Sequence, residues 1–93
     1  MKKRRVYKNQ PEEAFCSFIE QQNYIPMKRG WPDFFCFRGD EIICVEVKNY
    51  NAQPLKKEQL QVMKFLVSKG INCFRWNFES QILEPITQSS VRR

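Results

Sequence analysis

The sequence predicts a small α/β fold, in which a mixed sheet with a central hairpin is flanked by helices. Residues 11–23 and 55–69 each carry apolar side chains at helical spacing. Between them lie two apolar runs, "DFFCF" and "EIICVEV", joined by "RGDE", where Gly-Asp favours a two-residue hairpin turn. The apolar segment "INCFRW" follows the second helical segment and predicts one more strand.

Several local signals set the limits of these elements. Pro11 suits the first position of the first helix, and Gly70 is a good residue to follow the end of the second. Residues 25–32 and 49–54 predict loops. The segment "FESQILEPI" predicts an edge strand that ends at Pro85. The expected order is therefore helix, hairpin, helix, strand, with an optional last strand.

The length of 93 residues predicts one domain with a modest core. We expect a basic arm at residues 1–10, a single domain over residues 11–86 and a tail at residues 87–93. No apolar run approaches the roughly 20 residues that cross a bilayer. No apolar segment follows "MKKRR" either, so we expect no signal peptide and a cytoplasmic location without membrane partners.

The net charge of +6 is concentrated at the two ends of the chain. Without seven terminal basic residues, 9 basic side chains remain against 10 acidic ones, so the body is about neutral. Short basic arms suit contacts with nucleic-acid phosphates, although they also serve as solubilising tails. The predicted nucleic-acid contacts in the N-terminal arm are Lys2, Lys3, Arg4, Arg5 and Lys8.

The cysteine and histidine content restricts the chemistry. The four cysteines form no C-x-x-C pair and there is no histidine, which argues against a zinc site. Reduced, buried thiols are the favoured interpretation, with a Cys36–Cys44 bridge as the alternative. Without histidine, any acid–base catalysis must use carboxylates, lysine, tyrosine or metal-activated water.

The hairpin register assembles a group of charged side chains. If Gly39 and Asp40 form the turn, Asp33 faces Glu46, and Lys48 lies on the same face. Opposed like charges destabilise a sheet, and a divalent cation between the carboxylates would remove that cost. Magnesium commonly binds through one or two carboxylates. The alternative is a salt-bridged edge, in which Lys48 neutralises Glu46 and Asp33 is solvated.

These residues also resemble a known signature. Pro32–Asp33 and "EVK" at residues 46–48 are similar to the PD-(D/E)xK nuclease motif. The wider pattern, from residue 11 to 76, resembles the VRR-NUC branch, the virus-type replication–repair nucleases. The resemblance implies a small restriction-endonuclease-like core of αβββαβ type that cuts DNA with Mg²⁺ or Mn²⁺. It also implies that Asp33, Glu46 and Val47 bind metal, and that Lys48 is the catalytic lysine.

Two further site residues follow from the same family, which has a glutamate on the first helix and a glutamine on the second. Glu12 is in phase with the buried face of the first helix and is the candidate metal ligand. The alternative role for Glu12 is to interact with the helix dipole. Gln59 precedes the inward face of the second helix and is the candidate catalytic amide, or else a satisfied glutamine at the core edge. The segment "LKKEQ" lacks the serine or threonine that often precedes this glutamine in the family.

The predicted function is therefore a metal-dependent, structure-specific DNA endonuclease. Small stand-alone members of the family are similar to Holliday-junction resolvases and act as homodimers, so we expect branched DNA and a second copy of this chain as partners. The resemblance also implies a bacterial or phage-infected cell. The alternatives are a non-catalytic nucleic-acid-binding module that retains the fold, and a small regulatory interaction protein with basic arms. Neither alternative explains Asp33, Glu46 and Lys48 in one group.

Overall fold

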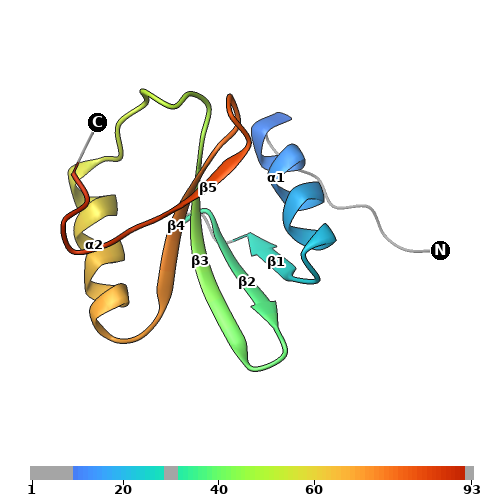
Figure 1. Ribbon diagram of the computed structural model, residues 1–93, viewed down its shortest axis with the longest axis horizontal. Coiled ribbons are helices and arrows are strands. Elements are labelled where there is room, and N and C mark those ends of the chain that lie inside the picture. The colour runs from blue at the N-terminus through green and yellow to red at the C-terminus, as the bar shows by residue number, and fades with distance from the viewer. Residues whose placement is uncertain (1–9, 29–31, 92–93) are drawn as a thin grey trace.

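The computed structural model describes residues 10–28 and 32–91, so the predicted arm contacts, Lys2 to Lys8, lie outside the described residues. The protein is a small compact α/β fold with two helices and a five-stranded mixed sheet (Figure 1). Its elements are α1 (Gln10–Gln21), β1 (Ile25–Lys28), β2 (Phe34–Arg38), β3 (Glu41–Lys48), α2 (Lys57–Ser68), β4 (Asn72–Asn77) and β5 (Ile82–Pro85). The strands lie in the order of the chain, and β3 and β4 are parallel while all other neighbours are antiparallel. The predicted fold class is confirmed.

Strand β1 is the element that the local sequence signals missed. Residues 25–32 predicted a loop, but Ile25–Lys28 pair with β2 along one edge of the sheet. Proline is tolerated in edge strands, because only one side of such a strand belongs to a hydrogen-bond ladder. Pro26 therefore did not prevent pairing. With β1 in place, the element order contains the αβββαβ series, followed by the additional strand β5.

The central hairpin has the predicted register. Phe37 pairs with Ile42 and Phe35 with Cys44, as a Gly39-Asp40 turn requires. Gly39 has φ +59°, the left-handed conformation that a type II′ turn places at its first central residue. Because side chains alternate along a strand, this register sends one set of residues to the face of α1 and the other to the face of α2.

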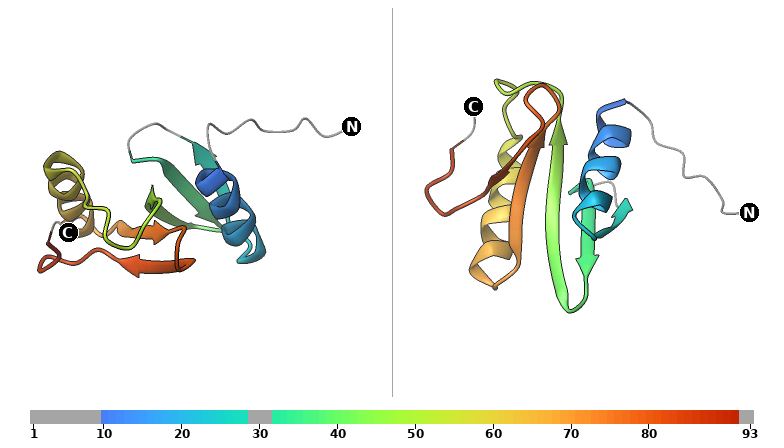
Figure 2. Two further views of the ribbon diagram at one scale, coloured as in Figure 1. Left: turned by 90° about the horizontal axis from the view of Figure 1, so that it is seen from above. Right: turned by 45° about the vertical axis from the view of Figure 1, so that its right-hand side comes forward.

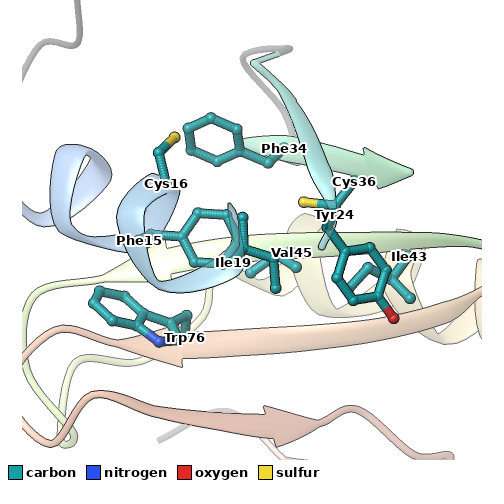
Figure 3. Close-up of a cluster of buried hydrophobic side chains, with 9 residues drawn as sticks. All are labelled: Phe15, Cys16, Ile19, Tyr24, Phe34, Cys36, Ile43, Val45 and Trp76. Carbon is teal, nitrogen blue, oxygen red and sulfur yellow. The ribbon is translucent and has the colours of Figure 1, made fainter. Parts of the chain in front are cut away.

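The helices cover opposite faces of the sheet (Figure 2). On the α1 face, Phe15 packs against the rings of Phe34 and Trp76, with centroid distances of 5.1 and 5.6 Å. Figure 3 shows this cluster, which consists of Phe15, Cys16, Ile19, Tyr24, Phe34, Cys36, Ile43, Val45 and Trp76. The cluster on the α2 face consists of Cys44, Leu55, Leu60, Met63, Cys73 and Ile86.

All four cysteines are buried free thiols, as the favoured interpretation predicted. Cys36 belongs to the cluster on the α1 face and Cys44 to the cluster on the α2 face. The alternative bridge between them does not form, because neighbouring strands direct these two side chains to opposite sides of the sheet. Burial raises the pKa of the Cys36 thiol to about 12, which keeps it protonated at neutral pH.

The arrangement of the elements concentrates several chain ends at one end of the sheet. The carboxyl end of β3 and the amino ends of α1 and α2 lie there together (Figures 1 and 2). Neither of the helices in the described part of the chain is long and apolar enough to cross a membrane.

The core on the α1 face predicts a test of stability. Replacing Phe15, which is fully buried, by alanine should lower the free energy of unfolding by about 3–5 kcal/mol, because it leaves a cavity against Phe34 and Trp76. The matched control is Phe65→Ala, since this ring is 59% exposed, and it should cost about 1 kcal/mol or less. Urea unfolding measures both, and equal losses would contradict the assignment of the core.

Candidate active site

Asp33 and Glu46 meet at the open end of the hairpin through reciprocal bonds to the main chain. The amide of Asp33 donates to Oε1 of Glu46 at 3.2 Å. The amide of Val47 donates to Oδ2 of Asp33 at 2.8 Å. Asp33 directly precedes Phe34, the first residue of β2, and its side chain binds the main chain of β3 just beyond the last paired residues of the two strands. The predicted meeting of these two carboxylates is thus present in the structure.

Gln59 links Glu46 to Lys48 from the first turn of α2. Its amide nitrogen donates to Oε2 of Glu46 at 2.7 Å, while its amide oxygen accepts from Lys48 Nζ at 3.2 Å. The same oxygen accepts from the amide of Lys56 at 2.9 Å, which ties the side chain to the start of the helix. Lys48 Nζ lies 3.7 Å from Oε2 of Glu46. The glutamine therefore fixes the relative positions of a carboxylate and an ammonium group.

This group is withdrawn from water. Glu46 is 4% exposed, Lys48 6% and Gln59 6%. Pro32 and Met63 border the small space beside Glu46 and Gln59, which has no room for a water molecule. Burial, and then the nearby charge of Asp33, raise the pKa of Glu46 to about 7, against the opposing effect of Lys48. Without a cation at the site, Glu46 is therefore only partly ionised at neutral pH.

Asp33 is half-buried and sits between the Glu46 group and a second ion pair. Burial is the main cause that raises the pKa of Asp33, the Val47 amide opposes it, and the charge of Glu12 raises it further. Glu12, on α1, is buried and forms an ion pair with Lys28. Lys28 is the last residue of β1 and pairs with Phe34 of β2. Glu12 thus lies near the site but is engaged by Lys28. Among the described residues, no three acidic or cysteine side chains are close enough together to hold a metal ion.

The main chain of Val47 adds an oxygen to the same place. The carbonyl of Lys48 accepts from the amide of Phe78, so it points toward β4. Successive residues of a strand direct their polar groups to alternate sides. The carbonyl of Val47 therefore points the other way, as its amide does, toward Asp33. Two carboxylates and this carbonyl form a set of hard oxygen donors, which fits magnesium or manganese.

Arg75 is a member of this region that the sequence did not indicate. It pairs with Glu46 across the parallel strands and is 3% exposed. Its guanidinium turns away from the carboxylates, with Nη2 donating to the carbonyl oxygens of Tyr50 at 3.1 Å and Gln53 at 2.7 Å. Arg75 therefore supports the loop that follows β3. The register of β4, which brings it here, depends on long-range parallel pairing and leaves no local signal.

The arrangement combines two opposed carboxylates, a buried ammonium group and a bridging amide at an end of the sheet where helix amino termini gather. Such a group suits charge stabilisation and proton transfer at an anionic substrate. Comparisons of this chain with protein-family models, with curated proteins and with solved structures each found no match.

The raised pKa of Glu46 predicts how stability depends on pH. Without metal, the folded state binds more protons than the unfolded state between pH 4.5 and about 7, so the free energy of unfolding falls as pH rises through this window. Glu46→Gln removes this titration and should be more stable than the wild type above pH 7, by up to about 3 kcal/mol. Urea unfolding in EDTA from pH 4.5 to 8 measures the effect. The same slope in both proteins would contradict the pKa assignment.

Proposed function

We propose that this protein is a metal-dependent DNA endonuclease of the PD-(D/E)xK type, within the VRR-NUC branch, that hydrolyses phosphodiester bonds. The observation that carries the proposal is the pairing of half-buried Asp33 with buried Glu46, which Gln59 joins to Lys48. An ion cluster that served only to stabilise the fold would not leave two carboxylates opposed at a cost to their ionisation. Functional sites tolerate such a cost.

Each residue has a definite task in this proposal. Asp33, Glu46 and the Val47 carbonyl would hold Mg²⁺ or Mn²⁺, which when bound supplies Lewis-acid stabilisation and activates water. Lys48 donates hydrogen bonds to the phosphate oxygens, where negative charge increases in the transition state. Gln59 keeps the lysine in place and leaves the two other protons of its ammonium group for the substrate. Glu12 would reach the metal only by exchanging its partner Lys28.

The surroundings of the site suit an anionic polymer. The amino ends of α1 and α2 lie at this end of the sheet, and their dipoles favour nearby phosphates (Figure 1). Lys56 and Lys57 are exposed at the start of α2. The basic arm at residues 1–10 would add contacts that do not depend on sequence.

Branched DNA and a homodimer complete the proposal. A unit of 93 residues has little surface for a large substrate, whereas a two-fold pair would present two sites to a junction with similar symmetry. A Holliday junction needs two cuts, which such a pair would deliver. The competing function, a nucleic-acid-binding module without catalysis, shares the same fold and is separated from the proposal by the following experiment.

The experiment compares cleavage by Asp33→Asn, Glu46→Gln and Lys48→Ala with that of the wild type. A panel of labelled flaps, junctions and duplexes is incubated with and without Mg²⁺, and DNA binding is measured in Ca²⁺. We expect each variant to lose at least about a hundredfold in turnover, because each loses charge stabilisation of the reaction, and to retain DNA binding. Glu58→Gln is the matched control, since Glu58 is exposed on α2 beside Gln59, and its cleavage should equal that of the wild type.

Two results would contradict the proposal. If the wild type binds branched DNA but cuts no substrate with Mg²⁺ or Mn²⁺, the protein is a binding module. If Asp33→Asn and Glu46→Gln unfold far more readily than the wild type in EDTA, the carboxylates are structural ions.

A further inference from the structure

The loop that follows β3 places an exposed aromatic side chain beside the candidate active site. Tyr50 is two residues beyond Lys48, so their Cα atoms lie at most about 7 Å apart. Its side chain is 62% exposed. The loop lies at the same end of the sheet as the amino terminus of α2 (Figures 1 and 2). The loop that carries Tyr50 therefore borders the end of the sheet at which β3 ends with Lys48.

The backbone on both sides of Tyr50 is firmly held. The buried guanidinium of Arg75 binds the carbonyl oxygens of Tyr50 and Gln53 in this loop. It also contacts the side chains of Asn77 on β4 and Glu84 on β5. The side chain of Gln53 accepts from the amide of Asn49 at 2.7 Å. The amide of Asn51 donates to Oε1 of Glu79 at 2.8 Å, in the turn between β4 and β5. These bonds fix the loop before any ligand arrives.

The Tyr50 side chain itself has no structural task in the described part of the chain. No described residue forms a hydrogen bond or ring contact with this side chain. The bond from Arg75 goes to the main-chain carbonyl oxygen of Tyr50. An aromatic ring in water forgoes the stabilisation that burial would give it. A fixed loop that holds such a ring outward, two residues from a buried lysine, is arranged for a planar partner.

We propose that Tyr50 is a stacking platform for an unpaired DNA base next to the phosphate at Lys48. The inference rests on the proposed nuclease function and specifies its substrate. Every base has a π-face, so stacking on tyrosine requires no particular sequence. In a continuous duplex both faces of each base are already stacked on neighbours. Tyr50 therefore selects DNA with an unpaired base at a flap, fork or branch over plain duplex.

Charges near the loop are compatible with this partner. Exposed Lys56 and Lys57 follow the loop, and exposed Glu58 comes directly after them. Of the other acids near the loop, Glu79 is engaged by the amide of Asn51, and Glu84 by Asn77 and Arg75. A base stacked on Tyr50 thus brings its phosphates to a region with basic side chains and a helix amino terminus.

Binding to fluorescent DNA tests the inference without cleavage. A forked DNA carries 2-aminopurine as the first unpaired base, and the control is a continuous duplex with 2-aminopurine at the same position. Both are titrated in Ca²⁺ with wild type, Tyr50→Ala, Tyr50→Phe and Phe65→Ala. Phe65 is the matched control, because it is an equally exposed ring, 59%, on α2.

We expect wild type, Tyr50→Phe and Phe65→Ala to quench the unpaired base on binding. Tyr50→Ala should lose the quenching and bind forked DNA about 5- to 100-fold more weakly, the range that base–aromatic stacking covers. Its binding to duplex should be unchanged. Equal quenching by Tyr50→Ala and the wild type would overturn the inference, as would an equal loss of affinity for fork and duplex.

The outcomes separate this inference from the nuclease proposal. If the wild type cuts nothing with Mg²⁺ and the quenching still depends on Tyr50, the stacking platform is supported and the nuclease proposal fails. If the wild type cuts forked DNA and Tyr50→Ala quenches and binds as the wild type does, the nuclease proposal stands and the stacking platform is refuted.

Discussion

Asp33 and Glu46 hold two carboxylates against each other where water is largely excluded. Glu46 accepts a hydrogen bond from the amide of Asp33, and Asp33 accepts one from the amide of Val47. Both bonds are possible because the Gly39 turn fixes the register of β2 against β3. A shift of one residue would move every side chain of one strand to the other face. The hairpin register therefore determines the two hydrophobic clusters as well as the candidate site.

The remaining elements support this pair from the side of α2. Gln59 satisfies Glu46 and Lys48 together, so the helix that covers this face also completes the polar group. Arg75 pairs with Glu46 in the neighbouring strand β4, and its Nη2 donates to two carbonyl oxygens of the loop after β3. The site and the loop with Tyr50 are thus held by two neighbouring sets of hydrogen bonds, one around Glu46 and one around Arg75, which pairs with Glu46 across β3 and β4. Such a network favours a single conformation.

The sequence predicted what local chemistry controls. The Gly39-Asp40 turn determined the hairpin register and so the meeting of Asp33 and Glu46, and helical spacing placed Gln59 inward. Strand β1 was missed because Pro26 and the nearby glycine indicated a loop, and the Lys28–Glu12 ion pair was missed with it. The position of Arg75 depends on the parallel pairing of β3 and β4, which only the assembled fold determines.

The central claim is that the opposed carboxylates form a cation site. Its most direct test is the melting temperature of the wild type and of Asp33→Asn at pH 8 as Mg²⁺ or Mn²⁺ is titrated. A ligand that binds only the folded state stabilises it by about 2.7 kcal/mol at a hundred times its dissociation constant. The account predicts a saturable rise for the wild type and little or none for the variant. No rise for the wild type, or an equal rise for both proteins, would contradict it.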